Sequence, residues 1–192
     1  MNFLEEKILK DGIIVQGNIL KIDSFLNHQI DISIMRQIAS ELKRRFSGAV
    51  VNKVLTIEAS GIAIATMLGH LYDVPVVFAK KSETANSIDD KYVSQAYSFT
   101  HKRMNSVFVS KPYLHPTDRV LIVDDFLADG QAMSALTNIV HQAGAEVVGL
   151  GVAVEKGQQQ GGKMLRSKGY QVESIAIIED MDYKTGKIVF RS

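Results

Sequence analysis

The sequence has 192 residues, of which 46% are hydrophobic and 22% are charged, and its formal net charge is +1. This length suits one α/β domain with a full core, and the near-neutral charge gives no basic surface that would argue for nucleic acid. The chain has no cysteine, which excludes a disulfide framework and a thiolate site and is compatible with a reducing cytoplasm. Acidic residues near the start and the lack of a long apolar run favour a soluble intracellular protein without a signal peptide or membrane span.

Helices and strands alternate in the first part of the chain. The periodicity predicts helices over residues 3–9, 31–46 and 62–71, and strands over residues 13–15, 19–22, 53–58 and 74–79. Ala59-Ser60-Gly61 forms a tight loop between a strand and a helix, so its backbone amides could hold an anion. Such a unit is also simply how α/β sheets are built, so the loop alone does not identify a site.

Two lysines and a polar segment follow the strand over residues 74–79. Lys80 and Lys81 come at the end of this strand, where a lysine is usually solvated but could also bind a phosphate. Residues 82–105 are polar and weakly patterned, with one possible strand over residues 92–99. A long insertion at the ligand edge of a sheet suggests a lid, and an ordinary surface hairpin is the alternative.

The second half of the chain continues the alternation. We expect strands over residues 106–110, 120–123, 145–154, 170–178 and 187–191, a helix from Gln131 that Gly144 stops, a short helix over 161–167, and a turn over 179–182. Residues 157–164 have the spacing of a nucleotide-binding P-loop except at Met164, where Ser or Thr would bind magnesium. The mismatch favours the short helix. The five histidines show no metal-ligand spacing.

The most informative stretch is the end of the strand over residues 120–123. Asp124 and Asp125 follow that strand, and after two apolar residues comes the loop Ala128-Asp129-Gly130-Gln131-Ala132. Ligands of open α/β sheets bind at the carboxyl ends of the strands. The loop amides suit a phosphate, and the carboxylates suit sugar hydroxyls or a metal. This pattern predicts a sugar-phosphate site, although solvated loop residues with a helix cap would have similar features.

This order of strand, acidic pair, small-residue loop and helix resembles the signature of the type I phosphoribosyltransferases. The resemblance implies a single α/β domain over residues 1–192 with a mostly parallel central sheet flanked by helices. It also implies an N-terminal hood, made by residues 1–30 with part of the C-terminus, and a lid loop over residues 82–105. Two positions depart from the commonest loop, because Asp129 stands where Thr is usual and Ala132 where Thr or Ser is usual. The lost hydroxyls leave more of the phosphate binding to backbone amides.

The resemblance also assigns roles in the use of phosphoribosyl pyrophosphate. It places Asp124 and Asp125 on the ribose hydroxyls, and the loop of residues 128–132 on the 5-phosphate. Ser60, Gly61 and Lys81 are placed near the pyrophosphate. Mg²⁺ would bind mainly through substrate oxygens, with no protein side chain identified as its ligand. The catalytic residues are then Asp124, Asp125 and Lys81.

Two features of the sequence bear on which purine base accepts the phosphoribosyl group. One is a departure from the hypoxanthine and guanine enzymes at Ala128, and the other is a resemblance over the full length of the chain. The hypoxanthine and guanine enzymes of the family carry Asp where this chain has Ala128. The chain looks instead like the bacterial branch that uses xanthine, which implies base contacts at Leu20, Asn27 and Lys156 and a cytoplasmic homodimer. An adenine or guanine enzyme is an alternative. A regulator that only senses the donor is another, but it would need a DNA-binding region, and neither a helix-turn-helix nor a basic patch is visible.

Overall fold

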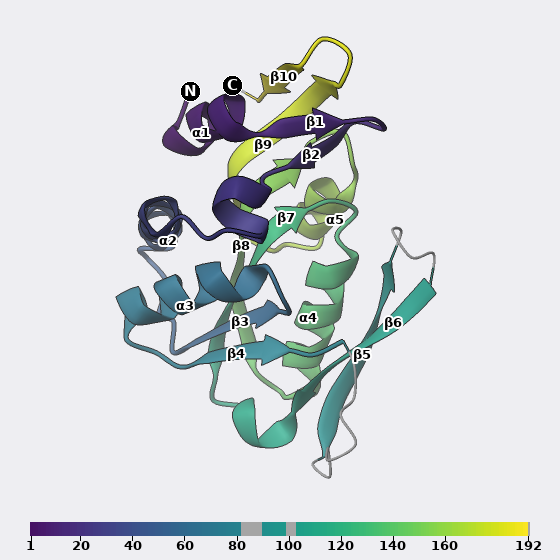
Figure 1. Ribbon diagram of the computed structural model, residues 1–192. Coiled ribbons are helices and arrows are strands. Elements are labelled where there is room, and N and C mark those ends of the chain that lie inside the picture. Colours follow the sequence, from purple (N-terminus) through teal and green to yellow (C-terminus); the bar gives the residue numbers. More distant parts are fainter. Residues whose placement is uncertain (82–89, 99–102, 192) are drawn as a thin grey trace.

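The computed structural model describes residues 1–81, 90–98 and 103–191, and its centre is a six-stranded sheet (Figure 1). The strand order is β10-β9-β8-β7-β3-β4. All neighbours pair in parallel except β10, which runs antiparallel to β9. The strands of this sheet are β3 (Lys53–Ile57), β4 (Val76–Ala79), β7 (Arg119–Leu127), β8 (Glu146–Lys156), β9 (Val172–Asp182) and β10 (Lys187–Phe190). The predicted fold class is therefore confirmed.

Helices cover both faces of the sheet and enclose two apolar cores. One core lies under α1 (Phe3–Asp11), α2 (Ile32–Arg45) and α3 (Gly61–Tyr72). The other lies under α4 (Gln131–Gln142) and α5 (Gly161–Ser167). Local sequence sets where two of these helices begin, because Asn2 and Asp31 accept hydrogen bonds from backbone amides in the first turns of α1 and α2.

Two hairpins lie outside the central sheet. The first, β1 (Ile13–Val15) and β2 (Ile19–Lys21), leads into a π-helical turn, η1 (Asp23–Asn27). It lies with both chain termini at the β9–β10 end of the molecule (Figure 1), where the N–H of Tyr183 donates to Asn18 Oδ1 at 3.1 Å. The second hairpin, β5 (Lys91–Ser98) and β6 (Arg103–Ser110), packs beside α4 and is followed by a 3-10 turn, η2 (Lys111–Tyr113).

Several predicted strand boundaries are off by a few residues, and strand pairing explains the two largest differences. Strand β7 continues past Val123 to Leu127, because β8 keeps pairing with it through Leu127 and Glu155, whereas its pairing with β3 is last recorded between Leu55 and Ile122. Residues 179–182, expected to form a turn, belong to β9 because β10 pairs with them, and the turn comes at residues 183–186. Of the predicted lid over residues 82–105, residues 82–89 and 99–102 lie outside the described residues, and the remainder belongs mainly to the second hairpin.

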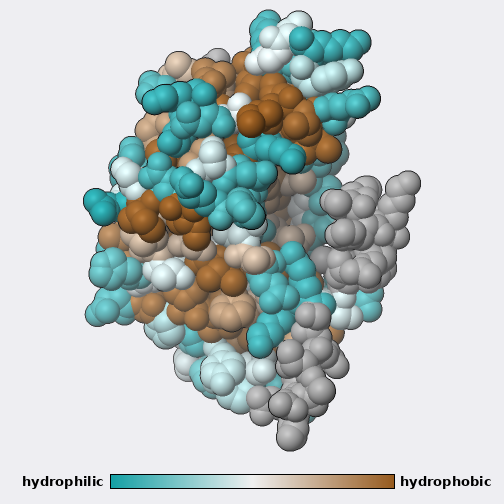
Figure 2. Space-filling view, viewed as in Figure 1, coloured by the Kyte–Doolittle hydropathy of each residue, from teal (hydrophilic) through white to brown (hydrophobic). Residues whose placement is uncertain are grey.

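Apolar side chains gather in two places on the face shown in Figure 2, over the α2–α3 region and over the first hairpin. Exposed members of these groups include Ile32 at 56% and Ile13 at 62%. Within the described ranges, no helix is both long enough and apolar enough to cross a membrane.

Candidate functional site

The paired aspartates lie in the second half of β7, toward the carboxyl edge of the sheet. Asp124 is only 6% exposed, while Asp125 is half-buried, and the N–H of Asp125 donates to Asp124 Oδ1 at 3.0 Å. Burial raises the pKa of the Asp124 carboxyl well above its usual range, and the negative charge of Asp125 raises it further. The positive charge of Lys81 acts in the opposite direction, so Asp124 lies within electrostatic reach of this predicted site residue.

The loop after β7 has the backbone geometry of an anion cradle. Gly130 caps α4 with a φ of +85°, a left-handed conformation that favours glycine. The N–H of Ser134 donates to the Gly130 carbonyl at 2.9 Å, which closes the first helical turn. The amides that precede Ser134 in α4 therefore have no carbonyl of the helix to bind, and they include the predicted phosphate residues Gln131 and Ala132.

The unusual residue of this loop, Asp129, uses its carboxylate in two ways. Its Oδ1 accepts the N–H of Gln131 at 3.2 Å, so the side chain caps α4 and takes up one of the cradle amides. Its Oδ2 is buried and has no hydrogen-bond partner among the residues that the structure describes. A carboxylate oxygen without a hydrogen-bond donor would repel an anion bound at the amides of this loop.

The loop that follows β3 packs directly on the aspartates. A Cβ added to Gly61 would lie 2.1 Å from Thr56 Oγ1 and 2.8 Å from Asp124 Oδ1. Only a residue without a side chain lets the N-terminus of α3, with Ser60 before it, come this close to β7. The hydroxyl of Thr56 is buried and unpartnered in the described part of the chain. The peptide bond between Glu58 and Ala59 is cis.

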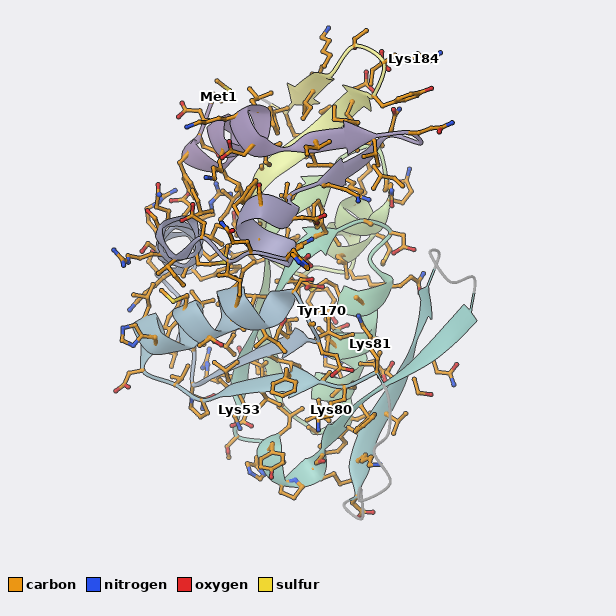
Figure 3. All side chains as sticks on the ribbon, in the orientation of Figure 1. Met1, Lys53, Lys80, Lys81, Tyr170 and Lys184 are labelled. Atoms are coloured by element: carbon orange, nitrogen blue, oxygen red, sulfur yellow. The ribbon has the colours of Figure 1, made fainter. Side chains whose placement is uncertain are left out.

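Lys81 is held at the same edge by its backbone. The N–H of Lys81 donates to Glu58 Oε1 at 2.7 Å. The preceding Lys80 pairs with Phe108 of β6 through two backbone hydrogen bonds of 3.0 Å. Figure 3 shows both lysines where the chain leaves β4, on the side of the second hairpin. The structure thus brings Asp124, Ser60, Gly61 and Lys81 to one place, with the loop of residues 128–132 directly after the aspartates.

The three residues predicted to contact the base come from three separate elements. Asn27, exposed in η1, shares a cavity of about 530 Å³ with Ser60. Lys156 ends β8 half-buried, with its Nζ 5.8 Å from the centroid of the Phe126 ring. Leu20 on β2 is 6% exposed and belongs to the apolar cluster beneath α1 and α2.

Three residues of this region were not predicted, namely Thr56, Glu58 and Phe126. Thr56 had a readable signal, because a polar residue inside a fully buried strand needs a partner. Phe126 stands inside the acidic motif, yet its apolar character suggested only packing. Nothing local pointed to Glu58, since its contact with Lys81 spans 23 positions.

A family model for the phosphoribosyl transferase domain matches residues 21–185. The chain is 49% identical to a xanthine phosphoribosyltransferase of Lachnoclostridium phytofermentans, over 100% of this chain and 98% of that protein. It is 50% identical to xanthine phosphoribosyltransferase 2 of Clostridium botulinum, over the full length of both.

Solved structures agree on the fold. The adenine phosphoribosyltransferase of Rhodothermus marinus gives a TM-score of 0.74 at 24% identity, covering 91% of this chain and 97% of that one. The APRTase of Giardia lamblia complexed with 9-deazaadenine gives a TM-score of 0.76 at 18% identity, covering 92% and 98%. With the acidic pair and both loops in the expected places of the sheet edge, the chain belongs to the phosphoribosyltransferase family.

Proposed function

We propose that the protein transfers the 5-phosphoribosyl group of phosphoribosyl pyrophosphate to a ring nitrogen of xanthine, giving xanthosine 5′-monophosphate and pyrophosphate, a purine salvage reaction. Relatives that match the whole chain at 49% and 50% identity carry the name of this reaction. The structural observation that carries the proposal is the close packing of Gly61 on Asp124. This packing brings the loop proposed to bind the pyrophosphate next to Asp124, one of the two carboxylates proposed to bind the ribose.

The donor would lie across the edge of the sheet. Its 5-phosphate would bind the amides of residues 128–132, and its ribose hydroxyls would donate to Asp124 and Asp125. The bond between C1′ and the pyrophosphate oxygen breaks, and pyrophosphate leaves with the bonding electron pair. The purine nitrogen forms its bond to C1′ and loses its proton to the leaving pyrophosphate or to solvent. Positive charge grows on the sugar during this transfer. Carboxylates already fixed beside the ribose stabilise that charge with little reorganisation. Burial raises the pKa of Asp124, and the positive charge of Lys81 favours the ionised form of this carboxyl.

The leaving pyrophosphate needs positive charge and amide donors. Ser60 and Gly61 at the start of α3 would supply amides, and Lys81 an ammonium. The residues of this site suit a Mg²⁺ ion that is bound mainly by oxygens of phosphoribosyl pyrophosphate. No three potential metal-binding side chains gather in the described ranges, and Mg²⁺ commonly takes one or two carboxylates together with substrate oxygens and water. When bound, the ion would neutralise part of the charge that builds up on the leaving group.

Selection of the base would fall to Leu20, Asn27 and Lys156. Xanthine carries a carbonyl at C2 where guanine carries an amino group, so the ammonium of Lys156 or the amide of Asn27 would favour xanthine. Ala128 gives no carboxylate of the kind that the hypoxanthine and guanine enzymes use. Transfer to adenine or guanine remains the alternative activity, and a purely sensory role is the less favoured alternative.

The organisation expected from the family is also part of the proposal. Residues 1–30 and part of the C-terminus would form a hood over the base, which fits the contact between Asn18 and Tyr183. The segment 82–105 would close over the reacting groups. We further propose a cytoplasmic homodimer, and the exposed Ile30 and Ile32 beside the cavity that Asn27 lines suit a subunit contact.

One assay tests the function. The protein is incubated with phosphoribosyl pyrophosphate, Mg²⁺ and either xanthine, guanine or adenine, and the nucleotide and pyrophosphate formed are measured. The highest kcat/KM is expected with xanthine. A preference for another purine would overturn the substrate, and no product from any of them would overturn the activity.

Asp125→Asn should depress kcat in the same assay because it weakens stabilisation of the sugar cation. Sedimentation of the protein measures the subunit number.

A further inference from the structure

The glycines at the start of α5 have a structural purpose that their P-loop-like spacing does not reveal. Gly161 and Gly162 are both buried, and the N–H of Gly161 donates to the carbonyl of Ala128 at 3.2 Å. These residues therefore face the protein, and in particular the back of the loop of residues 128–132. The short helix expected over residues 161–167 is present.

Gly161 touches the backbone of three consecutive residues of that loop. A Cβ added to Gly161 would lie 2.5 Å from the Ala128 carbonyl oxygen, 2.5 Å from the Gly130 nitrogen and 2.7 Å from the Asp129 carbonyl carbon. Conversely, a Cβ on Gly130 would lie 3.0 Å from the Gly161 Cα and 2.9 Å from the Met164 methyl group. The two glycines pack back to back, and no rotation of a side chain can make room for a methyl group.

Helix α5 is itself fixed to the end of β8. Glu155, which is 2% exposed, accepts two hydrogen bonds from Arg166 at 2.9 and 2.8 Å. It also accepts one from the hydroxyl of Ser174. A Cβ on Gly162 would lie 1.9 Å from Glu155 Oε1, so the helix lies directly on this ion pair. The surface behind the loop of residues 128–132 is therefore closely packed and is held in place by the Glu155–Arg166 ion pair.

We propose that Gly161, supported by Met164, is a positioning residue for the terminal phosphate of the donor. It forms the rear wall of the cradle and holds the amides of Ala128–Ala132 at the spacing that a phosphate requires. This inference rests on the proposed binding of the 5-phosphate to that loop. The pyrophosphate loop at Ser60 and Gly61 lies on a different strand, β3, so the wall should affect one end of the donor and leave the other unchanged.

The test compares two ligands that each occupy one end of the donor site. Calorimetry measures the binding of ribose 5-phosphate and, separately, of pyrophosphate with Mg²⁺, to wild type and Gly161→Ala. We expect at least a tenfold loss of affinity for ribose 5-phosphate, a similar rise in KM for phosphoribosyl pyrophosphate, and pyrophosphate affinity within twofold of wild type. Equal loss for both ligands would indicate general damage and overturn the proposal, as would unchanged ribose 5-phosphate affinity.

Two further variants keep the test decisive. Gly169→Ala is the control for general destabilisation, because Gly169 follows α5 with a φ of +88° that is unfavourable for alanine, but an added Cβ there meets nothing within 4 Å. It should lower the melting temperature without changing the affinity for ribose 5-phosphate. If Gly161→Ala does not fold, Met164→Ala removes the side chain behind Gly130 and should weaken ribose 5-phosphate at least threefold while pyrophosphate binding is unchanged.

A last variant distorts the cradle itself. Gly130 has a φ of +85°, and a Cβ there would lie 3.0 Å from the Gly161 Cα, so Gly130→Val should displace the loop backbone and abolish ribose 5-phosphate binding. If it does not, the site assignment fails and the inference fails with it. If Gly130→Val abolishes binding while Gly161→Ala and Met164→Ala leave it unchanged, the cradle stands and only the role of the wall is overturned.

Discussion

The carboxylate of Glu58 accepts a hydrogen bond of 2.7 Å from the backbone N–H of Lys81. This contact ties the end of β3 to the residue that follows β4 and fixes the backbone from which the Lys81 ammonium reaches the site. The same ammonium lowers the pKa of Asp124 against the effects of burial. In the proposed reaction, Glu58 would therefore act on the site of phosphoribosyl pyrophosphate through Lys81, without touching this substrate.

Removing the Glu58 carboxylate should leave the backbone of Lys81 less firmly held, because its N–H then loses its hydrogen-bond acceptor. We expect Glu58→Ala to lower kcat about tenfold, because a catalytic cation displaced by an ångström loses much of its effect on the leaving group. Glu58→Gln keeps an oxygen at the same position and should retain kcat within about threefold. The measurement is steady-state kinetics with phosphoribosyl pyrophosphate. The double variant Glu58→Ala with Lys81→Met should lose less kcat than the product of the fold-losses of the two single variants. A loss equal to that product would show that Glu58 does not act through Lys81.

The second prediction concerns the carboxylate of Asp129, whose Oδ2 has no hydrogen-bond partner among the described residues. Asp129→Asn keeps the Oδ1 acceptor that caps Gln131 and removes the negative charge beside the phosphate. We expect donor affinity to rise about fivefold, since a charge repulsion of about 1 kcal/mol is relieved at this partly exposed position. Titration calorimetry with ribose 5-phosphate measures this change.

Asp129→Ala separates charge from capping. It removes the same charge but also the helix cap, whose loss costs about 1 kcal/mol of stability. Thermal unfolding should therefore distinguish the two variants even where both bind the donor more tightly. Unaltered or weaker binding by Asp129→Asn would mean that the carboxylate does not oppose the phosphate.

The raised pKa of Asp124 predicts a pH-dependent cost in stability. Because folding raises this pKa above its ordinary value of 3.8, the folded state favours the neutral acid. That contribution is fully present below the unfolded pKa and is lost as the pH rises through the folded pKa. Above the unfolded pKa, folding therefore opposes the charge that the Asp124 carboxyl carries in the unfolded chain.

Asp124→Asn stays neutral and keeps an oxygen for the N–H of Asp125. We expect it to unfold with a free energy on the order of 1 kcal/mol higher than wild type at pH 7, with the difference vanishing below about pH 4. Denaturant unfolding across this range measures the effect. Turnover should fall about a hundredfold. A variant less stable than wild type at pH 7 would contradict the unfavourable burial of this charge.

Local sequence predicted much of the architecture because its signals are local. The periodic helices, the apolar strands and the stop at Gly144 each depend on neighbours in the chain. Strand ends were predicted less well, since β7 and β9 extend only where β8 and β10 pair with them. Pairing partners come from distant segments, so periodicity cannot set those limits.

The candidate site divides in the same way. The acidic pair and the loop of residues 128–132 lie close together in the sequence, so the local pattern and its family resemblance indicated them together. The contacts of Gly61 with Asp124, of Glu58 with Lys81 and of Gly161 with the loop join residues that are far apart in sequence. A glycine that permits close approach looks the same in sequence as one that only forms a turn. Its purpose becomes visible when the neighbouring backbone is known.

Lys156 and Phe126 give the final prediction, which concerns the base. The Lys156 ammonium lies 5.8 Å from the Phe126 ring centroid, which places a cation beside an aromatic face at the end of β7. A cation here can donate to the C2 carbonyl of xanthine but gains nothing from the amino group of guanine. Lys156→Ala should therefore lower the ratio of kcat/KM for xanthine to that for guanine about tenfold.

The matched control is Lys163→Ala, which removes an exposed lysine from α5 and should leave the ratio as in wild type. Competition between the two purines in one reaction measures the ratio directly and cancels differences in the amount of active enzyme. If Lys156→Ala lowers kcat/KM for both bases equally, the lysine supports the transfer itself. An unchanged ratio with unchanged rates would remove Lys156 from the base pocket and leave selection to Asn27 and Leu20.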